Sequence, residues 1–215
     1  LSRILANLEG RDWIERTNGR YEATERGAFV AGELTQLLAN IEALDELDGT
    51  MEWLPTEQFD FDLTCLRDAK VTTSSWSDHT ASIRRVADLI HEVDQVKGTA
   101  PGVSREVVEA LWESTVEGNG AFEAVLNATA LDIIRTDAGL RQQLREIVES
   151  GNAEITRYDG DAPLLMVLIC DDIVQMCGHD HDGPPPGTLE TTNETVLFWA
   201  ESYFDSVRAD AQPLD

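Results

Sequence analysis

Apolar residues at the start of the chain recur with the period of a helix. Four of them, spaced i, i+3, i+4 and i+7, predict one buried helical face: Leu1, Ile4, Leu5 and Leu8. Gly10 then ends the helix, and two short runs, 12–16 and 20–24, follow on either side of Asn18-Gly19. Because Asn-Gly supplies the positive φ angles of a type I′ turn, the pattern predicts a helix and then a hairpin.

A third element, a long helix, follows the hairpin. Thr24 is a plausible N-cap, and the helix is expected to run to about Asp48 and to end at Gly49. Its apolar residues are separated by 4, 3, 4 and 3 positions, which is typical of a coiled-coil seam: Val30, Leu34, Leu37, Ile41 and Leu44. We expect this seam to form a dimer contact. The alternative is that the stripe packs on the chain's own body.

Beyond residue 50 strands and helices alternate, which predicts a mainly parallel sheet covered by helices. The expected strands are 69–75, 95–101, 121–127 and 153–159, and the expected helices are 81–93, 104–118, segments within 131–151, and 195–210. Two apolar runs around Asp171-Asp172 predict a terminal antiparallel hairpin. The expected organisation is therefore a partial DNA-binding unit in 1–27, a dimerisation helix in 28–50 and an α/β domain in 51–215.

Helix, hairpin and helix follow one another as in the wing of a winged helix-turn-helix. In that fold the helix before the hairpin enters the DNA major groove, so its outward residues are expected to face base edges or phosphates: Ser2, Arg3, Ala6 and Asn7. Arg16, Asn18 and Arg20 at the hairpin tip are expected to lie along the DNA backbone. Two further helices precede the recognition helix in that fold, so we expect the chain to be part of a longer protein. Many other domains also begin with a helix and a hairpin, and that alternative stays open.

The charge distribution agrees with this division. The chain has 41 acidic and 16 basic residues, yet residues 1–26 hold five arginines and five acids. A polyanion could settle on that neutral patch without strong repulsion. Lysine is nearly absent, with only Lys70 and Lys97, while 42% of the residues are hydrophobic. We therefore expect a folded protein of a salt-rich cytoplasm, in which the Debye length falls to roughly 3 Å. An ordinary acidic protein is the alternative, and no apolar run is long enough to span a membrane.

Several short motifs together resemble the haloarchaeal winged helix-turn-helix transcription regulators. They are NGRYEATERGAFVA, WLPTEQFDFDL, RYDGDAP, CDDIVQMCG and LETTNETVLFWAESYF, and they extend over nearly the whole chain. The resemblance implies a C-terminal domain of the kind first described in a methanogenesis regulatory protein, with a phospholipase-D-like core. It further implies a homodimer that binds double-stranded DNA and senses a small molecule.

A phospholipase-D-like core also occurs in enzymes, so hydrolysis must be weighed against sensing. That chemistry needs a nucleophilic histidine two residues before a lysine, which holds the phosphoryl oxygens. Asp68 precedes Lys70 and Gln95 precedes Lys97 at that spacing. We expect no catalytic residues, and a hydrolase is the alternative from a different class.

Four residues with sulfur or imidazole ligands lie within twelve residues and could hold zinc or a similar ion: Cys170, Cys177, His179 and His181. A metal- or redox-responsive regulator is therefore a second alternative. The cysteines lack the close spacing of most structural zinc sites, and the histidines are equally typical of a solvated loop. No other cofactor is expected.

Ligands of open parallel sheets usually bind beyond the carboxyl ends of the strands. The polar residues expected there, which suit a polar metabolite, are Ser74, Ser75, Thr99, Asn127, Tyr158 and Asp159, with Asp171 brought near by the hairpin. Each of them could instead only cap a loop.

Overall fold

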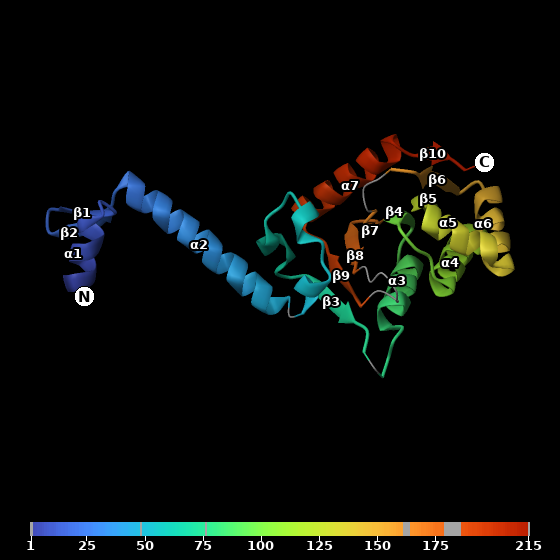
Figure 1. The fold of residues 1–215 in the computed structure, drawn as a ribbon, viewed down its shortest axis with the longest axis horizontal. Helices are drawn as coiled ribbons and strands as arrows, with labels where there is room; N and C mark the ends of the chain where they lie inside the picture. Colours follow the sequence, from blue (N-terminus) through green and yellow to red (C-terminus); the bar gives the residue numbers. More distant parts are fainter. Residues whose placement is uncertain (1, 48, 76, 161–163, 179–185, 215) are drawn as a thin grey trace. The chain divides into compact units, whose positions relative to one another are not determined.

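The chain divides into two compact units, Leu1–Glu46 and Leu47–Asp215 (Figure 1). The computed structural model describes residues 2–47, 49–75, 77–160, 164–178 and 186–214. In this part of the chain no helix is long and apolar enough to cross a membrane.

The N-terminal unit is a helix, a hairpin and a long helix. Its elements are α1 (Ser2–Gly10), β1 (Ile14–Thr17), β2 (Arg20–Ala23) and α2 (Glu25–Glu46). The turn residues Asn18 and Gly19 have φ angles of 54° and 82°, which is the left-handed conformation that a type I′ turn requires. The predicted helix, hairpin turn and long helix are confirmed.

Thr24 joins the hairpin to α2. Its hydroxyl accepts the N–H of Gly27 at 3.0 Å and donates to the carbonyl of Asp12 at 2.6 Å, so the predicted N-cap is confirmed. Gly27 is buried against the base of the hairpin, where any Cβ would overlap the carbonyl oxygen of Trp13. The N–H of Thr24 donates to that same carbonyl at 3.1 Å.

An eight-stranded sheet forms the centre of the C-terminal unit, in the order β10-β6-β5-β4-β7-β8-β9-β3. The strands are β3 (Lys70–Thr73), β4 (Gln95–Ala100), β5 (Ala121–Asn127), β6 (Ala153–Tyr158), β7 (Met166–Cys170), β8 (Ile173–Cys177), β9 (Gly187–Thr191) and β10 (Gln212–Pro213). The mixed α/β class and the hairpin of β7 and β8 are confirmed.

The expectation of a mainly parallel sheet needs a correction. Within the described sheet, β5 pairs in parallel with β4 and β6, and the remaining pairings are antiparallel. Parallel neighbours need a crossover, and helices connect β4 to β5 and β5 to β6, which are consecutive in the chain and adjacent in the sheet. The first predicted strand is instead the edge strand β3, antiparallel to β9.

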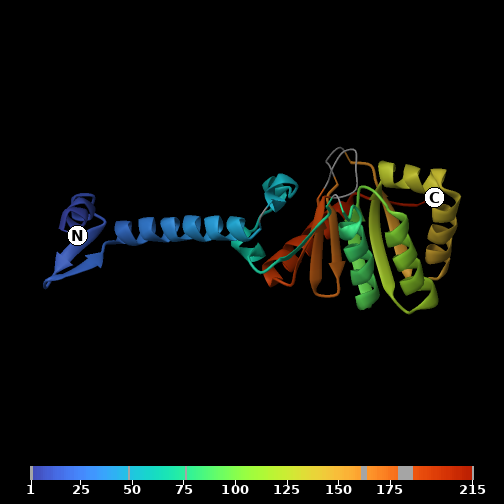
Figure 2. The ribbon, with the colours of Figure 1, turned by 90° about the horizontal axis from the view of Figure 1, so that it is seen from below.

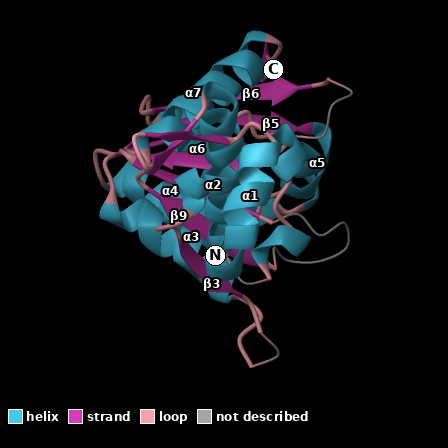
Figure 3. Ribbon diagram, turned by 90° about the vertical axis from the view of Figure 1, so that its left-hand side faces the viewer, coloured by secondary structure: helices cyan, strands magenta, loops and turns pink. Residues whose placement is uncertain are grey.

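Helices cover both faces of the sheet (Figures 1 and 3). One face carries α3 (Ala81–Glu92), α4 (Arg105–Trp112), α5 (Ala128–Thr136) and α6 (Ala138–Glu149), and α3 and α4 run alongside the strands in Figure 2. The other face packs on α7 (Glu194–Ala209) and on residues from the segment 47–71. The predicted helices are confirmed within a few residues of their expected bounds, although α4 is shorter because a wider helical turn continues it to Glu117.

Candidate nucleic-acid interface and ligand pocket

Helix α1 presents Arg3 and Asn7 to solvent, as expected of a surface that contacts DNA. Asn7 already has a partner, because its Oδ1 accepts the Nε–H of Arg11 at 2.9 Å. The guanidinium of Arg11 also lies 5.4 Å from the centre of the Trp13 ring. Sequence reasoning did not single out Arg11. Its spacing of i, i+4 from Asn7, across the end of the helix, was the signal that could have found it. The side chain of Ser2 lies outside the described residues.

The hairpin places its two arginines on opposite faces. Arg16 stands opposite Tyr21 and Arg20 stands opposite Thr17, in successive pairs of the ladder. Since successive side chains of a strand point to opposite faces, Arg16 and Arg20 diverge. Arg16 lies 5.7 Å from the centre of the Tyr21 ring. Both arginines and the tip residue Asn18 are exposed.

Two carboxylates face each other in the same hairpin. Glu15 is the direct partner of Glu22 in the antiparallel ladder, and both are exposed. Like charges at such positions repel. The face that carries this pair also carries Arg20, so only the tip of that face offers positive charge.

The expected seam of α2 is exposed to solvent within its own unit. The exposed fractions are 51% for Leu34, 54% for Leu37 and 45% for Ile41, while Val30 is half-buried. The side chain of Leu44 lies outside the described residues. Phe29 and Leu38 add further exposed apolar surface to this helix.

Four of the expected ligand residues lie at one edge of the sheet. Thr99, Asn127 and Tyr158 are at or near the carboxyl ends of β4, β5 and β6, and Ser74 follows β3 at the edge where β9 begins. Each of the first two stabilises the fold: the buried Thr99 hydroxyl donates to the carbonyl of Leu165 at 2.7 Å, and Asn127 caps α5.

Ser74, Ser75 and Asp159 at this edge also have polar partners. The hydroxyls of Ser74 and Ser82 lie 2.7 Å apart, and those of Ser75 and Ser77 lie 3.0 Å apart. Asp159 forms an ion pair with Arg157 at 2.7 Å. This edge therefore holds polar residues that bind one another.

Asp171 does not join the other expected ligand residues. Because β7 is antiparallel to β4, the turn after β7 lies at the start of β4, at the opposite edge of the sheet. Asp171 adopts a φ of 51°, and its carboxylate accepts the N–H of Gln95 at 3.0 Å and that of Asp94 at 3.3 Å. Its inclusion in a carboxyl-end site was wrong.

The cysteines of the expected metal set are buried free thiols. Burial raises the pKa of the Cys170 thiol and that of the Cys177 thiol to about 12, so both are protonated at neutral pH. His179 and His181 lie outside the described residues. The described residues contain no group of three or more metal-ligating side chains.

A partly buried ion pair that sequence reasoning missed links α3 to β9. Arg85 donates two hydrogen bonds to Glu190, at 2.6 Å and 2.7 Å, and the carboxylate of Glu190 also accepts from Gln175 at 3.4 Å. This bidentate contact raises the pKa of Arg85 above its ordinary value. No local sequence signal could have found it, because 105 residues separate the two partners.

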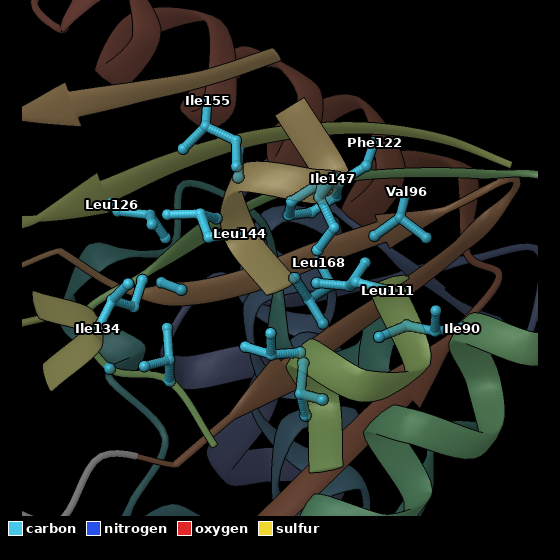
Figure 4. Close-up of a pocket in the computed structure, with 16 residues that line it drawn as sticks. Ile90, Val96, Leu111, Phe122, Leu126, Ile134, Leu144, Ile147, Ile155 and Leu168 are labelled. Atoms are coloured by element: carbon cyan, nitrogen blue, oxygen red, sulfur yellow. The ribbon is translucent and has the colours of Figure 1, made fainter. Parts of the chain in front are cut away.

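An apolar cavity of about 50 Å³ lies between the sheet and the helices of the first face (Figure 4). Its 16 lining residues are all hydrophobic residues or glycine. Val96, Phe122 and Leu126 line it from the strands, and Leu111, Leu144 and Ile147 line it from α4 and α6. None of the polar residues expected to bind a ligand lines this cavity.

An open polar cleft of about 590 Å³ lies at the amino ends of β4, β5 and β6. Lys97, Glu123 and Glu154 line it. Arg208 of α7 forms ion pairs with Glu123 at 2.6 Å and with Glu154 at 3.0 Å. Part of the negative charge of the cleft is therefore already neutralised.

Two family models match the chain. The model described as "Methanogenesis regulatory protein FilR1, middle domain" matches residues 80–210, more than half of the chain. The model described as "HVO_A0261 N-terminal domain" matches residues 1–46, the same residues that form the N-terminal unit. No curated protein sequence matches the chain.

Solved structures with a similar backbone include TrmBL2, described as an archaeal chromatin protein with a novel mode of DNA binding. It is 14% identical, with a TM-score of 0.50, over 99% of this chain and 82% of that chain. Nuc from Salmonella typhimurium, a phospholipase D family member, is 15% identical, with a TM-score of 0.49, over 68% of this chain and 99% of that chain. At 14% identity the similarity to TrmBL2 shows a shared fold alone. The TM-score of 0.49 with Nuc is too low to support an argument.

Proposed function

The chain belongs to the family of the methanogenesis regulatory protein FilR1, because residues 80–210 match the model of its middle domain. From this we propose that the chain is a DNA-binding transcription regulator. In this proposal two copies pair through α2, the N-terminal unit contacts DNA, and the C-terminal unit senses a small molecule.

The surface of the N-terminal unit is the observation that carries the proposal. Arg3 on α1 and Arg16 and Arg20 on the hairpin are exposed, in a segment without net charge on a chain of net charge −25. A helix followed by a hairpin is the arrangement that inserts into a major groove and contacts the flanking backbone. The divergence of Arg16 and Arg20 favours a contact of the hairpin tip alone.

The exposed seam of α2 supports pairing with a second copy. Leu34, Leu37 and Ile41 repeat at heptad spacing and are 45% to 54% exposed in the single chain, as in a coiled-coil helix without its partner. A two-fold dimer also presents two hairpins to the two halves of a palindromic site.

Salt adaptation and the absence of catalysis are parts of the proposal. The acidic surplus suits a protein of a salt-rich cytoplasm, as in halophilic archaea, because concentrated salt screens it. A phosphodiesterase assay tests the second part: turnover of a chromogenic phosphodiester, abolished by Lys97→Ala, would favour a hydrolase instead.

Fluorescence anisotropy with DNA from the promoter of the protein's own operon tests the central proposal. The full-length protein, in molar potassium chloride, is expected to bind that DNA more tightly than a scrambled duplex. Arg3→Ala is expected to reduce this preference by about 1–3 kcal/mol if Arg3 reaches a base edge. Arg20→Ala is expected to weaken binding to both duplexes equally through a lost phosphate contact.

Arg135→Ala is the matched control, because Arg135 is exposed on α5 and forms an ion pair with Asp132, three residues before it, at 3.2 Å. It should bind like the wild type. Equal binding of both duplexes at every salt concentration, or identical effects of Arg3→Ala and Arg20→Ala, would contradict the proposal.

A further inference from the structure

We infer that the apolar cavity beneath α4 and α6 is a binding site for a compact apolar group, either a small apolar molecule or the apolar end of a larger effector. This inference rests on the proposed sensing role of the C-terminal unit. The sequence predicts a polar metabolite as the effector, whereas this cavity would bind an apolar part of it.

The composition of the cavity supports an apolar occupant. A water needs two to four polar partners, and genuinely empty cavities are apolar. The 16 lining residues are hydrophobic or glycine, so no lining side chain could hold a water by a hydrogen bond. The cavity therefore suits an apolar group, which is stabilised by van der Waals contacts and needs no hydrogen bond.

The cavity lies where a ligand could enter. Ala100, Gly102 and Val103 line it and belong to the end of β4 and the loop that follows, at the carboxyl edge of the parallel strands, where open α/β sheets usually bind ligands. These three residues are half-buried, whereas Phe122 and Ile147 at the interior are buried. A Cβ added at Gly102 would meet no atom within 4 Å, so the loop is not tightly packed there.

The polar residues at the carboxyl edge of the sheet and the polar cleft at its amino edge are weaker candidates for an effector site. The side chains at the polar edge bind one another, as described for Ser74, Ser82 and Asp159. The cleft at the opposite edge is open to solvent, and Arg208 already forms ion pairs with two of its carboxylates. In the apolar cavity no lining side chain carries a polar group that could fill the site by pairing with a neighbour.

The volume limits the occupant. About 50 Å³ is a third of the roughly 150 Å³ of an engineered apolar cavity that binds benzene or xenon. We therefore expect xenon to enter the wild-type cavity, and benzene to enter only after the cavity is enlarged by Leu144→Ala.

Methyl NMR of the full chain under xenon pressure tests the inference. Methyl signals of Val96, Leu111 and Leu144 are expected to shift in a saturable manner, while those of Val174 and Leu189, in the core on the other face, stay in place. Ala124→Val adds carbon atoms to the lining and is expected to abolish the shifts. Ala110→Val is the matched control, because Ala110 is buried in the same core but does not line the cavity; its xenon response should remain.

Benzene, tested in the same way, is expected to shift the signals of Leu144→Ala and not those of the wild type. Absent or unsaturable xenon shifts in the wild type, equal shifts in both cores, or shifts that persist in Ala124→Val would overturn the inference. DNA binding is measured separately, so a failure here leaves the regulator proposal standing, and a failure of DNA binding leaves the cavity result intact.

Discussion

Gly27 at the start of α2 packs directly on the carbonyl of Trp13, with no room for a Cβ between them. Thr24 donates its N–H to that carbonyl and accepts the N–H of Gly27. The hairpin is thus fixed to the long helix at one point. The direction of the hairpin relative to α2 depends on a glycine.

Gly27→Ala is expected to destabilise the N-terminal unit by about 1–3 kcal/mol, because the added methyl group forces the backbone at Trp13 to move. Gly32→Ala in the same helix is the matched control. No atom lies within 4 Å of its added Cβ, so it should stabilise the helix by about 0.5–1 kcal/mol. Urea unfolding followed by hydrogen exchange at the hairpin measures both changes. Equal effects of the two substitutions would contradict the packing argument.

The seam of α2 gives a second prediction. Leu37→Glu combined with Ile41→Glu is expected to convert the proposed dimer to monomers, since burying an unpaired charge costs more than the ~2–7 kcal/mol of an unpaired neutral polar group. Light scattering reports the mass. Ala28→Glu combined with Thr35→Glu adds the same charge off the seam and should leave the dimer intact. An unchanged mass in the seam variant would assign the interface to another surface.

Salt dependence is the third prediction. The excess of 41 acids over 16 bases repels itself in dilute buffer and is screened in molar salt. The melting temperature is therefore expected to rise steadily from dilute to molar potassium chloride, as followed by circular dichroism. A melting temperature that does not change would rule out salt adaptation.

The thiols give a fourth prediction, which bears on the metal- and redox-responsive alternative. Because burial raises the pKa of Cys170 and Cys177 to about 12, iodoacetamide should modify them slowly in the native protein at neutral pH. Cys65, which is half-buried, is expected to react first. Peptide mass spectrometry ranks the three sites. Protection of all three that disappears with a chelator would instead favour a bound metal.

Asp137 gives a prediction about pH. The N–H groups of Leu140 and Gly139, together with Arg105, hold the pKa of this carboxyl below its ordinary value of 3.8. A lowered pKa in the folded state stabilises the protein above the ordinary value, and that contribution is lost as the pH falls through the folded value. We expect the melting temperature of the wild type to fall more steeply below pH 3.8 than that of Asp137→Asn, which keeps a capping side chain without the charge. Parallel pH profiles would be evidence against this carboxylate as the source.

The sequence predicted the local elements well because their signals are local. The turn at Asn18-Gly19, the cap at Thr24 and the helix that became α7 all depend on neighbouring residues. Pairing between distant strands was harder to predict. The strand β9 follows a proline run and was missed, and with it the antiparallel pairings of β9 with β8 and β3.

The candidate sites also divide into features that depend on neighbouring residues, which were predicted, and features that depend on distant contacts, which were not. Arg3, Arg16 and Arg20 are exposed as a surface pattern predicts, but the partner of Asn7 required the geometry of the helix end. The apolar cavity could not be predicted, since its lining comes from eight separate elements and from one connecting loop. Asp171 was misplaced because the direction of β7 was unknown.

The facing carboxylates of Glu15 and Glu22 make the hairpin a reporter of ionic strength in its own right. In dilute buffer their mutual repulsion opposes closure of a two-stranded ribbon, which has little stability to spare. Weak DNA binding at low salt would then record an open hairpin as well as repulsion from the acidic body. Glu22→Gln separates the two causes, because it relieves the ribbon while leaving the charge of the body unchanged.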